Sequence, residues 1–205
     1  MNQIEDKKIV AVTGVIRSGK NSFADLIQAE LKDTAPNLIV EQFSFAFHLR
    51  QELFQFINDN LNIDAFTEDE KEKAIIRPLL IAYGNAKREV SKNQYWIEKL
   101  HRKIERSNCD VALITDLRFA ETEDDELGWL KRNRGFNFHL KRYKFSQLRN
   151  NKVYEKAPNE FEKRNNPKLE ANAKRVIEIE RYKKIEDFYS AAKEEVSKII
   201  GFFLV

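Results

Sequence analysis

Short apolar runs along the chain alternate with longer segments in which apolar residues recur every three or four positions. The short runs predict buried strands, and the three-to-four spacing predicts helices with one buried face. Strands that alternate with helices favour a mostly parallel sheet with helices on both faces. The predicted strands are residues 8–13, 38–43, 111–115, 136–140 and 175–179.

The segment between the second and third predicted strands has the apolar spacing of several helices. Pro78 disfavours helix at the residue before it and suits the first turn of a helix, so we expect Arg77 at a bend between two helices. Asn93 is expected to cap a later helix. The apolar face of that helix is formed by Trp96 or Ile97, Leu100 and Ile104.

Two polar segments follow the third predicted strand. Residues 121–126 hold five acids in six positions and predict a solvated helix start. Residues 143–173 contain few apolar positions, and a loop of that length is usually a lid or disordered. The last predicted strand precedes a helix whose apolar face should pack on the sheet.

Length and composition fit one α/β domain with a small lid, because 205 residues are too few for two large domains. Cys109 is the only cysteine, which excludes an internal disulfide and a cysteine zinc site. The N-terminus is acidic where a signal peptide is basic, and no apolar run approaches the ~20 residues of a membrane helix. We therefore expect a cytoplasmic protein with no membrane partner.

The sequence GVIRSGK at residues 14–20 follows the first predicted strand and fits the pattern G-x-x-x-x-G-K. A strand, a glycine loop and a helix in that order are the context of a phosphate-binding loop, although an ordinary glycine turn is the alternative. Glycine lets several backbone N–H groups face one anion, and the helix that begins near Ser18 adds its N-terminus. Lys20 supplies a mobile positive charge for the phosphates of ATP. The predicted ATP-binding residues here are Gly14, Arg17, Ser18, Gly19, Lys20, Asn21 and Ser22.

The expected metal is Mg²⁺, but the residue after the loop lysine is Asn21 where a serine or threonine is usual. An amide oxygen is a weak ligand for Mg²⁺, so binding would rely on Ser22, on water or on an acid elsewhere. Asp116 is such an acid at the tip of a predicted strand, where it can hold the metal or cap the following turn. The phosphate loop favours the first role. The candidate metal ligands are Asn21, Ser22 and Asp116.

A basic stretch covers residues 131–153, with eight lysines or arginines and no acid. It predicts a nucleic-acid patch, a phosphate-facing lid that includes Arg142 as an ATP-binding residue, or simply a basic surface. The net charge of +3 does not favour nucleic acid as a partner.

Four segments together resemble the deoxynucleoside monophosphate kinases of bacteriophages, a branch of the P-loop nucleoside monophosphate kinases. The segments are 14–22, 43–50, 77–96 with its RPLL start, and ITDLRF at 114–119 with Glu121. The resemblance covers positions 8 to 121. It implies a three-layer P-loop NTPase sandwich in one domain (residues 1–205), with an acceptor-binding helical insert at about 44–107 and a lid at about 141–173.

The resemblance also implies roles for individual residues. Lys20 would grip the donor phosphates, arginines would surround the acceptor monophosphate and the transferred group, and Asp116 would lie by the metal. The family usually has Asp at the position of Asn21, and its lid often has a histidine shortly before a glutamate, where this chain has Asn159-Glu160. A homodimer is usual in the family. The implied catalytic residues are Lys20, Arg88, Asp116 and Arg118, and the implied acceptor-binding residues are Ser44, Phe45, Arg50, Arg77, Arg88, Trp96, Arg118 and Glu121.

The leading hypothesis is therefore ATP-dependent phosphorylation of a deoxynucleoside 5′-monophosphate, with ATP and Mg²⁺ as cofactors. A related P-loop kinase that acts on phosphomevalonate or dephospho-coenzyme A is the first alternative. A non-catalytic protein that binds nucleotides or nucleic acid is the second. The sequence does not indicate which base is accepted.

Overall fold

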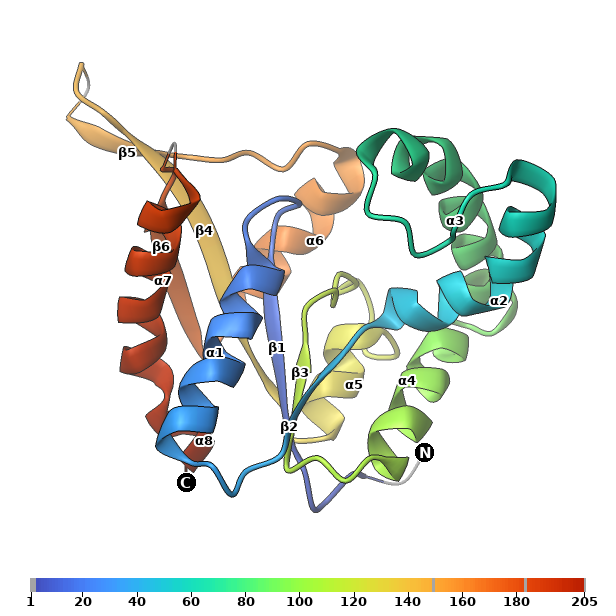
Figure 1. The fold of residues 1–205 in the computed structure, drawn as a ribbon, viewed down its shortest axis with the longest axis horizontal. Coiled ribbons are helices and arrows are strands. Elements are labelled where there is room, and N and C mark those ends of the chain that lie inside the picture. Colours follow the sequence, from blue (N-terminus) through green and yellow to red (C-terminus); the bar gives the residue numbers. More distant parts are fainter. Residues whose placement is uncertain (1–2, 149, 183, 205) are drawn as a thin grey trace. The chain divides into compact units, whose positions relative to one another are not determined.

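The computed structural model describes residues 3–148, 150–182 and 184–204, which form two compact units (Figure 1). The helical unit is Phe43–Arg106, and the sheet unit is Asn2–Gln42 together with Ser107–Val205. Among the described residues, no helix is long and apolar enough to cross a membrane.

Within the described residues, the sheet unit is built on a six-stranded, mostly parallel sheet, which confirms the predicted α/β fold class. Strand β1 (Lys8–Gly14) lies between β3 (Val111–Ile114) and β4 (Phe136–Ser146) and is parallel to both. The strand order is β2-β3-β1-β4-β5, and β6 pairs in parallel with β4. The remaining strands are β2 (Val40–Phe43), β5 (Asn151–Tyr154) and β6 (Arg175–Glu180).

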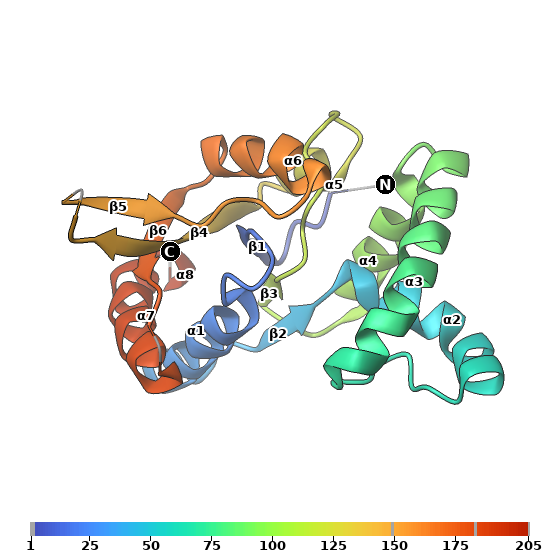
Figure 2. The ribbon, with the colours of Figure 1, turned by 90° about the horizontal axis from the view of Figure 1, so that it is seen from above.

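Helices cover both faces of this sheet (Figure 2). One face packs against α1 (Lys20–Thr34) and α7 (Ile185–Ile199), and the other lies under α5 (Glu126–Arg132) and α6 (Glu160–Ala171); α8 (Gly201–Leu204) follows α7. Strand β1 is apolar on both sides because both faces of the sheet are covered, so its middle residues are completely buried. The main core lies between the sheet and the α1–α7 pair, with Val12, Phe23, Ile27, Phe138 and Ala192 among its buried members.

The helical unit consists of α2 (Phe45–Leu61), α3 (Glu70–Val90) and α4 (Gln94–Arg106). The predicted bend at Arg77 is wrong, because α3 continues through Pro78 as one helix. Pro78 and Ala74 are both exposed, so water can satisfy the Ala74 carbonyl that the proline leaves without a helical donor. The predicted apolar face of α4 is confirmed, and its buried residues are Trp96, Ile97, Leu100, His101 and Ile104.

The prediction of a long lid loop at residues 143–173 needs correction, because ordered elements fill most of it. Strand β4 runs on to Ser146 and pairs antiparallel with β5, and Tyr143 lies opposite Tyr154 in this hairpin. The segment then forms α6, which Asn159 caps through a hydrogen bond from the Glu162 amide of 2.8 Å. Exposed side chains along β5 explain why the sequence lacks a strand pattern here.

Candidate functional site

The phosphate-loop motif forms a tight turn between β1 and α1, at the carboxyl end of a central parallel strand. Gly14 and Gly19 have φ angles of 140° and 91°, values that side chains disfavour. A Cβ at Gly14 would lie 2.5 Å from the Leu140 carbonyl oxygen, and one at Gly19 would lie 2.7 Å from Cζ of Phe188. Both glycines are therefore required by conformation and by space.

The start of α1 suits an anion. The helix begins at Lys20 rather than near Ser18, with Gly19 as its N-cap; it has no side-chain cap in the described chain and no acid in its first turn. The first N–H groups of a helix carry a partial positive charge and lack helical acceptors. Asn21 is exposed and Ser22 half-buried in this first turn, while Ser18 is completely buried in the loop.

Lys20 folds back over the loop. Its Nζ donates to the carbonyl oxygens of Gly14 at 3.0 Å and Val15 at 2.8 Å. Burial, helped by the positive charge of Arg118, lowers the pKa of Lys20 to about 8, although Glu162 and Asp116 oppose the shift. The lysine is therefore charged at neutral pH, and its charge is sensitive to the groups around it.

These electrostatic effects place Asp116 and Arg118 near Lys20. Both residues follow β3, whose carboxyl end lies beside that of β1 in the parallel sheet. Asp116 is half-buried and Arg118 exposed. The fold of the sheet unit thus brings three of the predicted catalytic residues to one edge of the sheet, which is where ligands bind in open α/β sheets.

The acidic run 121–126 is not simply a solvated helix start. Asp125 and Glu126 are 1% and 2% exposed, and their carboxylates accept backbone hydrogen bonds from the loop after β3. Glu126 Oε2 accepts from the amides of Arg118 at 2.6 Å and Phe119 at 3.1 Å. Asp125 Oδ2 accepts from Glu121 and Thr122 at 2.5 and 2.7 Å. These acids fix the loop that carries Arg118.

Helix α6 brings further polar groups to the loops, and the sequence reasoning missed them. Glu162 Oε2 accepts from the Ile16 amide in the phosphate loop at 3.0 Å. Asn165 accepts from the Ala120 amide at 2.8 Å and donates to Glu121 at 3.1 Å. The only sequence signal for Glu162 was its place three residues after the helix cap Asn159, where a glutamate usually bonds back to its own helix.

Arg142 lies on β4, two positions after Leu140, which pairs with Gly14 of the loop. Its guanidinium stacks 4.8 Å from the centre of the Phe188 ring, the same ring that backs Gly19. Burial lowers the pKa of Arg142, and its Nε has no hydrogen-bond partner among the described residues. This contact gives Arg142, predicted as an ATP-binding residue, a position next to the loop.

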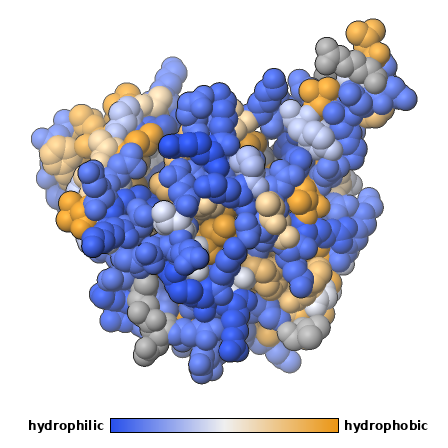
Figure 3. All heavy atoms as spheres, turned by 180° about the vertical axis from the view of Figure 1, so that it is seen from behind, coloured by the Kyte–Doolittle hydropathy of each residue, from blue (hydrophilic) through white to orange (hydrophobic). Residues whose placement is uncertain are grey.

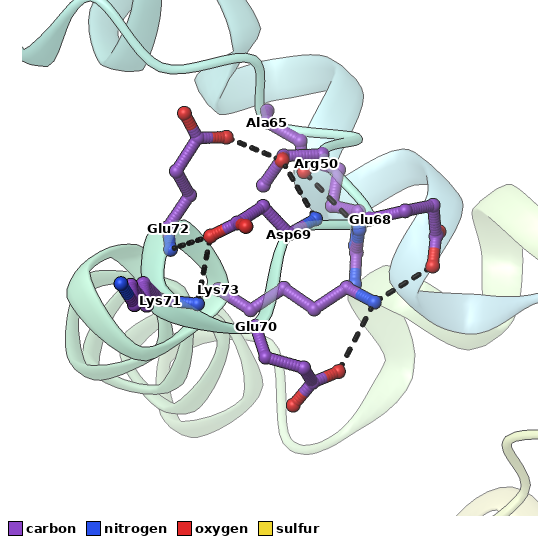
Figure 4. Close-up of polar contacts among 9 residues, drawn as sticks. Arg50, Ala65, Glu68, Asp69, Glu70, Lys71, Glu72 and Lys73 are labelled. Atoms are coloured by element: carbon purple, nitrogen blue, oxygen red, sulfur yellow. Dashed lines mark hydrogen bonds and ion pairs between the residues drawn. The ribbon is translucent and has the colours of Figure 1, made fainter.

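In the helical unit, Arg50 lies on α2 and donates to the Ala65 carbonyl at 3.2 Å, beside the capped start of α3 (Figure 4). Asp69 caps that helix by accepting from the amides of Lys71 and Glu72. Arg77 is exposed on α3, whereas Arg88 is 7% exposed. The predicted acceptor residues of this unit thus lie on two helices with different exposure.

The other predicted acceptor residues of the helical unit are less accessible. Trp96 is 3% exposed and donates its indole N–H to the Gly84 carbonyl at 3.1 Å, so the side chain joins α4 to α3. Phe45 is buried at the start of α2, and Ser44, half-buried, is its N-cap. Acceptor binding by these residues stays a prediction.

A polar cluster in the helical unit was not predicted. Glu52 accepts from the hydroxyls of Tyr83 and Tyr95, each at 2.8 Å, and pairs with Lys99 at 2.7 Å. Partial burial opposes ionisation, but the hydrogen bonds from Lys99 and the two tyrosines lower the pKa of Glu52. The cluster joins the three helices, and no motif in the sequence indicated it.

Much of the predicted basic stretch forms the β4–β5 hairpin, where several charges are paired. Lys141 pairs with Glu170 and Lys152 with Glu178, each at 2.7 Å. Apolar side chains are exposed toward the end of the hairpin (Figure 3). Leu148 is 98% exposed. Paired lysines and exposed apolar side chains differ from the uniform basic surface that favours nucleic-acid binding.

One of the candidate Mg²⁺ ligands, Asp116, has the chemistry and position that such a site needs. Among the described residues no group of three or more His, Cys, Asp or Glu side chains could hold a metal ion. Phosphoryl-transfer sites need no such group, since Mg²⁺ there is held by one or two carboxylates with water and substrate phosphates. Asp116, half-buried and electrostatically coupled to Lys20, fits that requirement.

Comparisons with known proteins give no family. No family model matches the chain, and neither does any curated protein. A gluconokinase from Sinorhizobium meliloti 1021 aligns with 99% of this chain and 98% of its own, at 11% identity and a TM-score of 0.37. The structure of APE1195 aligns with 97% of this chain and 99% of its own, at 16% identity and a TM-score of 0.37. Similarities of this size carry no information about activity.

Proposed function

We propose that this protein is a P-loop kinase that transfers the γ-phosphoryl group of ATP to a deoxynucleoside 5′-monophosphate. One observation carries the proposal: the glycine loop and Lys20 lie at the end of β1, next to Asp116 and Arg118 from the end of β3. A triphosphate needs backbone N–H groups and mobile cations at one place. The loop, the start of α1 and the two cations are groups of that kind.

The chemistry requires little from the protein beyond alignment and charge. An oxygen of the acceptor monophosphate attacks the γ-phosphorus, and the bond from that phosphorus to the β–γ bridging oxygen breaks, which leaves ADP. The attacking oxygen is already anionic, so no strong general base is needed. Lys20 and Arg118 would neutralise the charge that develops on the transferred group.

Magnesium fits the proposed site. Asp116 would hold it directly or through water, with Ser22 or Asn21 in the first turn of α1 as further oxygen ligands. When bound, Mg²⁺ would neutralise part of the negative charge of the nucleotide phosphates. Asn21 is exposed, and its neutral amide oxygen is the weakest of these ligands. We therefore assign most of the metal binding to Asp116.

The acceptor class rests on the sequence resemblance to the bacteriophage kinases. We assign acceptor binding to the helical unit, through Arg50, Arg77 and Arg88, and the lid to the β4–β5 hairpin with α6. A homodimer and a cytoplasmic location belong to the same proposal. Kinases of phosphomevalonate or dephospho-coenzyme A have a similar loop and are separated from this proposal only by their acceptors.

The test is an assay of ADP release from ATP and Mg²⁺ with each deoxynucleoside monophosphate in turn, and with phosphomevalonate and dephospho-coenzyme A. We expect turnover that requires a deoxynucleoside monophosphate and falls about a hundredfold or more in Lys20→Ala, since a charge at the reacting phosphates is lost. Turnover with another acceptor instead would reassign the substrate.

The competing proposal, a non-catalytic binding protein, predicts a different result. ATP would bind without acceptor-dependent turnover, and DNA or RNA would bind with strong dependence on salt. Retention of a labelled oligonucleotide at moderate salt, together with no conversion of any acceptor, would favour it over the kinase.

A further inference from the structure

The glutamate at the third position of α6 contacts the phosphate-binding loop directly. Glu162 Oε2 accepts a hydrogen bond of 3.0 Å from the Ile16 amide, and the side chain is only 9% exposed. Ile16 is the third residue of the glycine loop, whose amides are the groups that would bind phosphate. A carboxylate oxygen therefore already occupies one of the loop's donors.

The negative charge of Glu162 also reaches the loop lysine. Glu162 raises the pKa of Lys20 against the effects of burial and Arg118, so the two side chains interact electrostatically. The carboxylate accepts a hydrogen bond from a loop amide and attracts the loop lysine from a distance, which are two kinds of interaction that a nucleotide phosphate would also have with the loop.

Neighbouring residues hold α6 in place around this contact. The Phe161 ring packs edge-on to Phe119 with ring centres 4.6 Å apart. Asn165, one helical turn further along, accepts from the Ala120 amide at 2.8 Å. These contacts anchor the helix to the loop after β3, so Glu162 is presented to Ile16 by a fixed helix face and not by a free loop.

We propose that Glu162 is an internal competitor for the phosphates of the nucleotide and thereby sets the affinity of the loop. The proposal rests on the function proposed above, because it requires the loop to bind nucleotide. A triphosphate that approaches the loop meets like charge, so the carboxylate must leave Ile16 before the phosphates can use that amide. Nucleotide binding is then coupled to a movement of Glu162, and with it to α6.

The decisive variant is Glu162→Gln, which keeps the size of the side chain and an oxygen that can accept from Ile16 but removes the charge. Its matched control is Glu160→Gln on the same helix turn, where the side chain is 81% exposed and pairs with Lys163. Calorimetric titration with ATP and with inorganic tripolyphosphate, at pH 7 with and without Mg²⁺, gives the dissociation constants. Thermal unfolding of each variant checks that it is folded.

We expect Glu162→Gln to bind both ligands about tenfold more tightly than the wild type, the size expected for removing a charged competitor from one hydrogen bond. Glu160→Gln should bind like the wild type. Glu162→Asp keeps the charge on a shorter side chain, withdrawn from Ile16, and should have an intermediate affinity; it also serves if Glu162→Gln is not folded.

Equal or weaker binding by Glu162→Gln would overturn the inference, because it would make Glu162 a support of the loop or a group that acts with the metal. If the wild type binds ATP in a Lys20-dependent manner in that experiment, the proposed function survives and only the inference fails. If neither the wild type nor Glu162→Gln binds ATP at millimolar concentration, both fail.

Discussion

Gly19 combines two constraints that act on a single residue. Its φ of 91° suits glycine, and the space for a Cβ is taken by the Phe188 ring. We expect Gly19→Ala to lower the free energy of unfolding by about 1–3 kcal/mol, since both backbone strain and a steric clash are introduced. Urea denaturation of the purified variant measures the loss.

Gly201→Ala is the control for this prediction. Gly201 has no atom within 4 Å of an added Cβ and no positive φ, so alanine should be neutral or slightly stabilising there. The double variant Gly19→Ala/Phe188→Ala removes the clash but keeps the strain. Equal stability of Gly19→Ala and Gly201→Ala would contradict the geometry of the loop.

Under the proposed function, the shifted pKa of Lys20 predicts that nucleotide binding depends on pH. Burial and Arg118 lower the pKa of Lys20 to about 8, so its ammonium is charged below that pH and loses its proton above it. ATP affinity should therefore fall as the pH rises through about 8, by at most about tenfold per pH unit for the loss of one proton. Dissociation constants for ATP between pH 6.5 and 9.5 give the profile.

Lys20→Arg separates the charge of the lysine from other pH effects. The guanidinium stays protonated over this range, so the affinity of the variant should be nearly constant, even if it is lower than that of the wild type. Parallel pH profiles in the two proteins would mean that a different group, or ATP itself, is responsible.

At the scale of elements, a buried polar network joins β1, β4 and α6 beneath the site. The Thr13 hydroxyl contacts His139 Nδ1 at 2.9 Å, and Asn137 donates to Thr13 at 2.9 Å and to the Leu169 carbonyl at 3.1 Å. Burial lowers the pKa of His139 to about 4, and its Nε2 has no hydrogen-bond partner in the described part of the chain. The histidine is therefore neutral in the folded protein at physiological pH.

This network predicts lower stability in mild acid. Above pH 6.5 His139 is neutral in both the folded and the unfolded state and adds no pH dependence. Between pH 6.5 and about 4 the unfolded chain binds a proton at His139 that the folded state excludes. The free energy of unfolding therefore decreases as the pH is lowered, by about 3 kcal/mol in total. Urea denaturation from pH 7.5 to 4.5 should show a shallower decline for His139→Asn than for the wild type. Identical slopes would mean that His139 accepts its proton in the folded state.

Helix α3 carries a proline in its interior. Pro78 lies inside the helix and is exposed. Pro78→Ala restores a backbone donor to the Ala74 carbonyl, so we expect the helical unit to gain about 1–3 kcal/mol of stability. Urea denaturation measures the gain, with Ala82→Pro, at another exposed position of α3, as the destabilising counterpart. A loss of stability in Pro78→Ala would show that the helix is adapted to the proline.

At the scale of the whole molecule, the sequence predicts the fold class and the position of the glycine loop because both depend on local patterns. Buried parallel strands are apolar along most of their length, so β1 and β3 are recognisable within one residue, whereas β6 shows an alternation in which Ile177 and Ile179 are buried and Glu178 is exposed. The G-x-x-x-x-G-K pattern together with the strand before it locates the loop. These features need no knowledge of distant contacts.

The features that were missed depend on contacts between distant segments. Glu162 and Ile16 are 146 positions apart, and Asn165 and Ala120 are 45 apart, so no local pattern joins them. Asp125 and Glu126 look like solvated acids until the loop after β3 supplies their buried donors. The helical continuity of α3 through Pro78 depends on solvent exposure, which residue spacing does not give. The polar residues of the candidate site could therefore be identified only from the structure.

The division into two units predicts that donor and acceptor binding can be separated by mutation. Arg77 is exposed on α3 of the helical unit, whereas the phosphate loop belongs to the sheet unit. Under the proposed function, Arg77→Gln should raise the KM for the deoxynucleoside monophosphate about tenfold or more, since one charged contact to a phosphate is lost. The dissociation constant for ATP should not change.

Arg102→Gln is the control, because Arg102 is an exposed arginine of α4 that pairs with Glu98 and has no predicted role. Steady-state kinetics with varied acceptor, together with calorimetric titration of ATP, measure both quantities. Unchanged KM in Arg77→Gln would remove Arg77 from the acceptor site, and weaker ATP binding would show that the two functions are not divided between the units.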